Sequence, residues 1–164
     1  MTVISSIKDE KALTLTVVAE FDASVERVWR VWSDPRQLER WWGPPSWPAT
    51  FEQHEFVVGG RSHYYMTGPE GEKARGLWTM TTIAPPHRLE FEDSFADDDG
   101  NPSTDMAPIQ MAVTIEADGA RTHMTMISTF DSVEHLDSVL AMGMAEGLGE
   151  ALGQIDDLLA EATS

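Results

Sequence analysis

The segment IQMAVTIEADGARTHMTMISTF, residues 109–130, carries the clearest structural signal in the chain. Apolar and polar residues alternate on both sides of Asp118-Gly119, as in strands that place one face on a core. Asp-Gly favours two-residue hairpin turns because both turn positions need a positive φ. Residues 109–117 and 121–130 are therefore predicted to form an antiparallel hairpin.

Further strand-like runs precede this hairpin, and glycine- and proline-rich turns separate them. Three of the separators are Gly59-Gly60, the GPEG sequence at 68–71 and Pro85-Pro86. The predicted strands are Leu13 to Phe21, Ala49 to Val58, Arg61 to Thr67, Lys73 to Ile83 and His87 to Phe95. Together with the hairpin they predict a meander of about seven strands.

Two short helices are predicted between the first and second of these strands. Ser24 is a suitable N-cap for the first, and apolar residues follow it at helical spacing. These residues are Val25, Val28, Trp29 and Trp32. Pro35 is expected to start the second helix, which continues through Trp42. Gly43-Pro44-Pro45 ends it, because glycine takes the left-handed cap and proline cannot continue a helix.

One long amphipathic helix is predicted at the C-terminal end, from Ser132 to near Glu161. Asp131 is expected to cap it, with Glu134 as the reciprocal partner of a capping box. Its apolar stripe must pack on the sheet. The predicted fold class is α+β: a curved antiparallel sheet wrapped on a long helix, with two short helices after the first strand.

Length and composition limit the classes of function. The 164 residues, 41% of them hydrophobic, are expected to form a single domain over residues 1–164. Eleven basic and 28 acidic residues give a net charge of −17, which excludes nucleic acid and anionic membranes as expected partners. The chain has no cysteine and no apolar run near the ~18 residues of a membrane span. A cytoplasmic location is expected.

The order of predicted elements resembles the helix-grip fold of the START/SRPBCC superfamily, which includes the birch-pollen allergen. The opening FDASVERVW at 21–29, followed by Asp34-Pro35 and by Trp41-Trp42-Gly43-Pro44, looks like that of homologues of the activator of heat-shock protein 90 ATPase. Later landmarks similar to that family are Gly59-Gly60-Arg61, Met66 with GPEG at 68–71, IAPPHRL at 83–89 and Thr122 with Met124-Thr125. The resemblance extends from about Phe21 to the C-terminal helix.

The resemblance implies several functions, because the superfamily includes lipid and polyketide carriers, cyclases, resistance proteins and chaperone partners. Two positions depart from the family pattern. Val57 replaces a basic residue ahead of the paired glycines, and GMAEG at 143–147 replaces a tryptophan of the last helix. We therefore do not expect this protein to have any function that depends on those two positions in the family.

An internal cavity is expected, since a helix laid over a concave sheet leaves space unless large side chains fill it. Gly147 and Ala151 lie on the inward stripe, with Gly143 at its edge. They either leave room for a ligand or only let helix and sheet pack closely. The expected cavity residues are mainly aromatic residues and methionines, which also make ordinary cores. They are Trp42, Tyr64, Met66, Trp78, Met80, Phe91, Asp93, Met111, Met124, Met126, Leu140, Met144 and Leu148.

Asp93 is the one acid expected to point inward, because it shares the parity of Leu89 and Phe91. It is a candidate buried polar anchor or base. With His54 and Tyr64 it forms the candidate acid–base set of an enzyme.

Two other groups of residues give weaker evidence for a metal site or a catalytic site. His54 and His63 with Glu52 or Glu55 offer metal ligands only in principle, so no metal is expected. The local trio of Asp131, Ser132 and His135 lacks the strand–turn–helix context that exposes a nucleophilic serine.

The function favoured by the sequence is non-covalent binding of a hydrophobic or aromatic small molecule, lipid- or polyketide-like, without a cofactor. Trp41, Trp42 and Trp47 are expected near the mouth of its cavity, where they either gate a ligand or anchor the short helices. The alternative is a protein-interaction module of co-chaperone or stress-response type. The second alternative is a cyclase- or dehydratase-like enzyme that uses the same cavity.

Overall fold

The computed structural model describes residues 3–99, 101–102 and 107–161. These residues form eight strands in one antiparallel sheet, in the order β1-β2-β8-β7-β6-β5-β4-β3. The strands are β1 (Val3–Asp9), β2 (Thr14–Phe21), β3 (Ala49–His54), β4 (Arg61–Thr67), β5 (Lys73–Ala84), β6 (Arg88–Phe95), β7 (Ile109–Asp118) and β8 (Arg121–Thr129). The helices are α1 (Val25–Ser33), α2 (Pro35–Leu38), α3 (Val133–Ala141) and α4 (Met144–Glu161).

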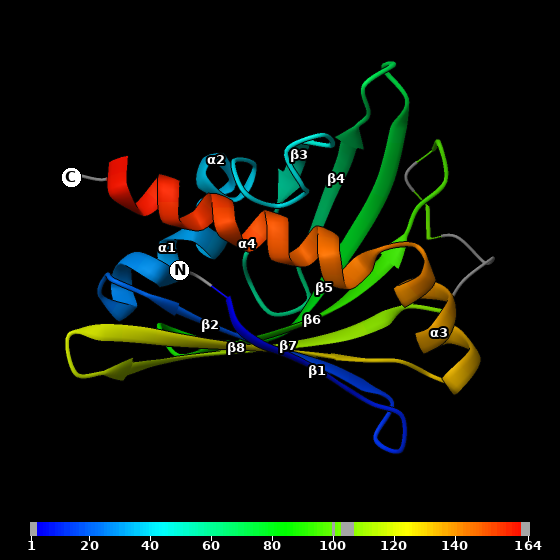
Figure 1. Cartoon of the computed structure of the whole chain (residues 1–164). Helices are drawn as coiled ribbons and strands as arrows, with labels where there is room; N and C mark the ends of the chain where they lie inside the picture. Colours follow the sequence, from blue (N-terminus) through cyan, green and yellow to red (C-terminus); the bar gives the residue numbers. More distant parts are fainter. Residues whose placement is uncertain (1–2, 100, 103–106, 162–164) are drawn as a thin grey trace.

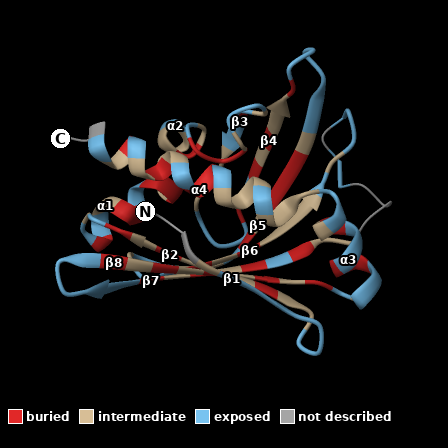
Figure 2. Ribbon diagram, in the orientation of Figure 1, coloured by how far each residue is buried: buried red, intermediate tan, exposed pale blue. Residues whose placement is uncertain are grey.

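Helix α4 lies across one face of the sheet, with α1 and α2 toward its C-terminal end and α3 beyond its N-terminal end (Figure 1). Buried positions alternate along the central strands, as in β2 and β8, so one face of these strands packs on the core (Figure 2). The predicted hairpin is confirmed, with Asp118 opposite Arg121 across the turn. The predicted α+β helix-grip fold is confirmed as a whole. Among the described residues, no helix is long and apolar enough to cross a membrane.

Strand β1 was not predicted, and it raises the number of strands from about seven to eight. It pairs with β2 at the edge of the sheet, and residues 6–10 are exposed. Its sequence, VISSIKD, has no sustained apolar alternation because its side chains have little core to cover. Lys8 and Asp9 are typical of an edge strand that must not pair with another chain.

The prediction of one long C-terminal helix is wrong, because α3 and α4 are separate. Gly143 adopts φ +91° between them, and its N–H donates to the carbonyl of Leu140 at 3.0 Å. Glycine reaches this left-handed conformation without a steric penalty, so it ends α3. The apolar stripe continues through the break and conceals it in the sequence. The cap also differs: Ser132, rather than Asp131, accepts the helical N–H of His135 at 3.0 Å.

Two elements were predicted to be longer than they are. Helix α2 ends at Leu38, and the chain then turns through Trp41 and Trp42. Strand β3 ends at His54 instead of Val58, after a register shift between Phe51 and Gln53. In both places apolar residues continue into irregular backbone, so periodicity alone overestimates the length of the helix or strand.

Candidate functional site

A cavity of about 430 Å³ lies between the helices and the concave face of the sheet. The sheet contributes Tyr64, Met66, Ala74, Asp93, Phe95, Ile109 and Met111. Helices α3 and α4 and the turn between them contribute Val139, Met142, Gly143, Met144, Gly147, Leu148 and Ala151. The segment after α2 adds Trp42, Gly43, Pro44 and Trp47, and Gln154 of α4 holds this segment by donating to the carbonyl of Gly43 at 2.7 Å.

The thirteen residues predicted for the cavity divide into two groups. Seven line it: Trp42, Tyr64, Met66, Asp93, Met111, Met144 and Leu148. The other six pack in or against the core outside it: Trp78, Met80, Phe91, Met124, Met126 and Leu140. Parity along a strand shows which face a residue occupies, but not which part of that face is covered.

An aromatic cluster fills the part of the concave face nearest α1. Trp32 of α1 packs against Trp41 with ring centroids 4.7 Å apart, and Trp78 stacks on Phe91 at 4.2 Å. The cluster therefore closes one half of the concavity as solid core. The cavity is the remaining half, beneath α3 and the first turns of α4.

Sequence reasoning missed several lining residues. Phe95 and Ile109 share the inward parity of Asp93 and Met111, so the same signal was present for them. Val139 reaches the cavity from α3 and Met142 from the turn that follows it, and the separation of α3 from α4 was not predicted.

Gly147 faces open space rather than a packed neighbour. A Cβ atom built on it would meet no atom within 4 Å, and the residue lines the cavity. Close packing of helix and sheet therefore does not require glycine here. Its missing side chain enlarges the cavity instead.

Tyr64 and Asp93 form the polar part of the cavity wall. The Tyr64 hydroxyl donates to Oδ1 of Asp93 at 3.1 Å, and to do so the ring crosses β5 at Gly76. Burial raises the pKa of the Asp93 carboxyl to about 7, although the hydrogen bond from Tyr64 opposes the shift. Burial, followed by the charge of Asp93, raises the pKa of the Tyr64 phenol well above its usual value. Asp93 is thus poised to gain or lose a proton near neutral pH.

Two indole groups adjoin this pair. Trp42 and Trp78 approach the Tyr64 hydroxyl and act to lower its pKa, but neither indole N–H closes a hydrogen bond of good geometry. Both nitrogen atoms are buried, and Trp42 is only 7% exposed while lining the cavity. A buried donor without a partner is costly, so this corner of the protein has unused hydrogen-bonding capacity.

His54 does not join the candidate acid–base set. Its Nε2 lies 3.0 Å from the carbonyl of Trp32 and its Nδ1 lies 2.7 Å from the hydroxyl of Ser62. Because a carbonyl only accepts, Nε2 carries the proton and Nδ1 accepts from Ser62. Burial lowers the pKa of His54, so the ring is a neutral structural link between α1 and β3.

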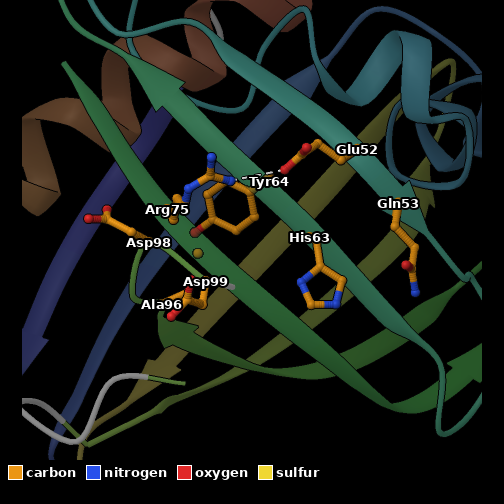
Figure 3. A pocket seen from close by; sticks show the side chains of 9 residues that line it. Glu52, Gln53, His63, Tyr64, Arg75, Ala96, Asp98 and Asp99 are labelled. Carbon is orange, nitrogen blue, oxygen red and sulfur yellow. Dashed lines mark hydrogen bonds and ion pairs between the residues drawn. The ribbon is translucent and has the colours of Figure 1, made fainter. Parts of the chain in front are cut away.

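His63 lies on the opposite face of the sheet from His54. It lines a polar hollow of about 400 Å³ with Glu52, Arg75 and Asp99 (Figure 3). Arg75 donates to Glu52 there at 3.0 Å. The two imidazoles considered as metal ligands are therefore not brought together.

One group of potential metal ligands occurs elsewhere among the described residues. Atoms of Glu20, Asp118 and His123 lie within 4.8 Å of one another at the end of the β7–β8 hairpin. The guanidinium group of Arg121 also forms an ion pair with Glu20 and already neutralises this carboxylate. The group is explained as a surface ion-pair network.

A helix-grip fold with a cavity between its helices and its sheet places the protein in the START/SRPBCC class. The family described as "Activator of Hsp90 ATPase homolog 1-like protein" matches residues 22–160. The chain belongs to this family. A search of curated proteins finds no match.

Solved structures agree with this assignment. A protein from Arthrobacter aurescens is 56% identical, with a TM-score of 0.94 over 99% of this chain and 95% of that one. A protein from Mycobacterium smegmatis is 45% identical, with a TM-score of 0.90 over 99% and 98% of the two chains. DynU16, from the dynemicin biosynthetic locus, shares the fold at 18% identity and a TM-score of 0.62, over 87% of this chain and 47% of that one.

Proposed function

We propose that this protein is a cytoplasmic binding protein that holds a hydrophobic or aromatic small molecule, non-covalently, in the cavity beneath α3 and α4. The observation that carries the proposal is the apolar cavity of about 430 Å³ with the Tyr64–Asp93 pair in its wall. Small-molecule sites are typically apolar hollows of roughly 300–1,000 Å³ with a few fixed polar groups. Gly147 supports the same proposal, since its missing side chain adds volume.

The composition of the wall suits a flat, apolar ligand. Trp42, Trp47, Tyr64 and Phe95 supply aromatic surface, and four methionines supply adaptable thioether surface. Burial of apolar surface, at about 25 cal/mol per Å², is the main source of affinity.

Ligand titration tests the proposal. Quenching of tryptophan fluorescence and thermal stabilisation are measured against polycyclic aromatic compounds, flavonoids and long-chain alcohols. A saturable change is expected, because a ligand that binds only the folded state raises its apparent stability. Trp42 and Trp47 line the cavity, so they are expected to report its filling.

Two leucine variants of α4 separate cavity binding from surface binding. Gly147→Leu places a side chain in the cavity and is expected to abolish binding, whereas Gly153→Leu makes the same change at an exposed position and is expected to leave it intact. Equal affinity in both variants would place the ligand elsewhere. No saturable change across the panel would reject the proposal and favour the protein-interaction alternative.

Acid–base chemistry on the bound molecule is the second candidate function. The Tyr64–Asp93 pair favours it, since a carboxyl with a pKa of about 7 both accepts and donates protons at neutral pH. Recovery of each bound compound, followed by measurement of its mass and its chromatographic retention, distinguishes the two functions. An unchanged compound indicates a carrier, whereas loss of water or a cyclised isomer, either of which Asp93→Asn abolishes, indicates an enzyme.

A further inference from the structure

We infer that the ligand carries a protonated amine that docks on Asp93, and that the cavity rejects carboxylates built on the same apolar scaffold. This inference rests on the proposed function, because it names the chemical class of molecule that the same cavity takes.

The cavity wall can carry negative charge but no positive charge. Among its eighteen lining residues, Asp93 is the only acid, and the wall includes no lysine, arginine or histidine. A buried carboxylate of a ligand would therefore meet a like charge and no counter-charge. Desolvation without a partner makes such a complex costly, whereas a cation gains a partner for its own charge.

Asp93 has acceptor capacity left for a ligand. Among the described residues, the Tyr64 hydroxyl is the one hydrogen-bond donor to its carboxylate, at 3.1 Å. An ionised carboxylate offers about four acceptor positions. An ammonium group, with three donors and no acceptor, is complementary to the positions that remain.

Aromatic rings adjoin this carboxylate on β4 and β5. The Tyr64 ring lies beside it, and Trp42 packs edge-on against Tyr64 with ring centroids 6.1 Å apart. Ring faces attract cations within about 6 Å of the centroid, and more strongly where water is excluded. The net charge of −17 adds a long-range field that attracts cations and repels anions.

The groups that face Asp93 determine how binding depends on pH. Trp42, Trp78 of β5, Ile109 of β7 and Met144 of α4 do not titrate, and Tyr64 of β4 has its pKa raised away from neutrality. Asp93, with a pKa of about 7, is the group that changes charge between pH 6 and 8. The amine is expected to bind its ionised form.

Three derivatives of one ring system test the inference: the aminomethyl, hydroxymethyl and carboxylate derivatives of anthracene. Affinities are measured by tryptophan fluorescence and calorimetry at pH 8. The amine is expected to bind at least about tenfold more tightly than the carboxylate, with the uncharged alcohol between them. Between pH 8 and pH 6 the affinity for the amine is expected to fall about tenfold, because Asp93 with a pKa of about 7 becomes protonated. The affinity for the alcohol stays constant.

Two variants test whether the preference for the amine depends on Asp93. Asp93→Asn is expected to weaken the amine about tenfold and to remove the pH dependence of its binding. Near-ultraviolet circular dichroism shows whether the variant is folded. Tyr64→Phe keeps the carboxyl group but removes the hydrogen bond that lowers its pKa. The pH at which the amine loses affinity is therefore expected to rise in this variant, and an unchanged pH profile would overturn the inference if Asp93→Asn fails to fold.

The outcomes separate the two proposals. Binding of all three derivatives with equal affinity, or tightest binding of the carboxylate, overturns the inference and leaves the binding function standing. Absence of binding by these derivatives and by every compound of the panel overturns the proposed function itself. A preference for the amine that survives in Asp93→Asn also overturns the inference.

Discussion

Gly76 on β5 lies beneath the ring of Tyr64 on β4, and its lack of a side chain lets the phenol reach Asp93 on β6. The two residues are direct cross-strand partners. A Cβ atom at Gly76 would lie 2.2 Å from Cζ and 2.3 Å from Oη of Tyr64, closer than real contacts allow. An aromatic ring over a strand glycine is a recognised way to cover the exposed backbone.

Gly76→Ala is expected to push the Tyr64 ring away from Asp93. The ring stacks on Phe51 with centroids 5.1 Å apart and is itself buried, so its displacement strains the core. The expected loss of stability is about 1–3 kcal/mol, typical of overpacking. Urea denaturation measures it, and near-ultraviolet circular dichroism reports the ring.

A double-mutant cycle provides the control for Gly76→Ala. In a Tyr64→Ala background the ring is absent, so the three atoms that lie closest to the added methyl group are gone and the substitution is expected to cost less. An equal loss in both backgrounds would contradict the role assigned to the Tyr64–Gly76 contact.

Asp93 is expected to make the protein less stable as pH rises. Burial raises its pKa in the folded state from 3.8 to about 7, so the folded chain binds more protons than the unfolded chain between these values. Its contribution to stability is fully present below about pH 4 and is lost as pH rises through 7. At about 1.4 kcal/mol per pKa unit, the loss is at most about 4 kcal/mol.

Asp93→Asn isolates this effect, because the amide is similar in size and does not ionise. The free energy of unfolding of wild type relative to the variant is expected to fall steadily between pH 4 and pH 7 in urea denaturation. Parallel pH profiles for the two proteins would show that the Asp93 carboxyl is not desolvated in the folded state.

The sequence predicts the inward direction of Asp93, because period-two alternation from Leu89 and Phe91 fixes the face of β6. It does not predict that Tyr64 meets Asp93 across an intervening strand. That contact depends on the register of Gly76 opposite Tyr64, which only the paired sheet determines. Local alternation thus predicts the face of a strand, while the site itself depends on non-local pairing.

The extent of the cavity could not be predicted from the strands alone. Trp78 and Asp93 are cross-strand partners on the same face, yet Trp78 is fully buried against Trp32 while Asp93 lines the cavity. The difference comes from how far α1 and the segment after α2 cover the sheet. Helical periodicity gives the buried side of α1, but not its position over β5 and β6.

His54 is expected to destabilise the protein when it becomes protonated. Burial lowers its folded-state pKa below the ordinary value of 6.5, and Nδ1 of its ring accepts the hydrogen bond from the Ser62 hydroxyl only while Nδ1 is unprotonated. The stability that neutral His54 contributes is therefore present above about pH 6.5 and is lost as pH falls through 6.5 toward the folded-state pKa.

An Asp93→Asn background makes this loss measurable, because the opposing effect of Asp93 is absent. In that background stability is expected to fall on acidification, and His54→Gln is expected to remove the part of the fall that His54 causes below pH 6.5. Titration of the His54 ring by nuclear magnetic resonance checks the direction directly. A folded-state pKa above 6.5 would contradict the arrangement of its hydrogen bonds.

Gly147→Ala is expected to stabilise the fold, which tests whether this glycine is retained for space rather than for packing. Its Cβ would meet nothing within 4 Å, so the variant gains helix propensity, about 0.5–1 kcal/mol, without a clash. Gly153→Ala on the same helix is expected to gain as much, whereas Gly60→Ala is expected to lose stability, since its Cβ would lie 2.2 Å from the carbonyl of Glu55. Thermal denaturation of the three variants shows whether each substitution raises or lowers the stability of the protein. A loss in Gly147→Ala would mean that helix α4 packs on the sheet where the structure has open space, and the cavity would then be smaller than a ligand needs.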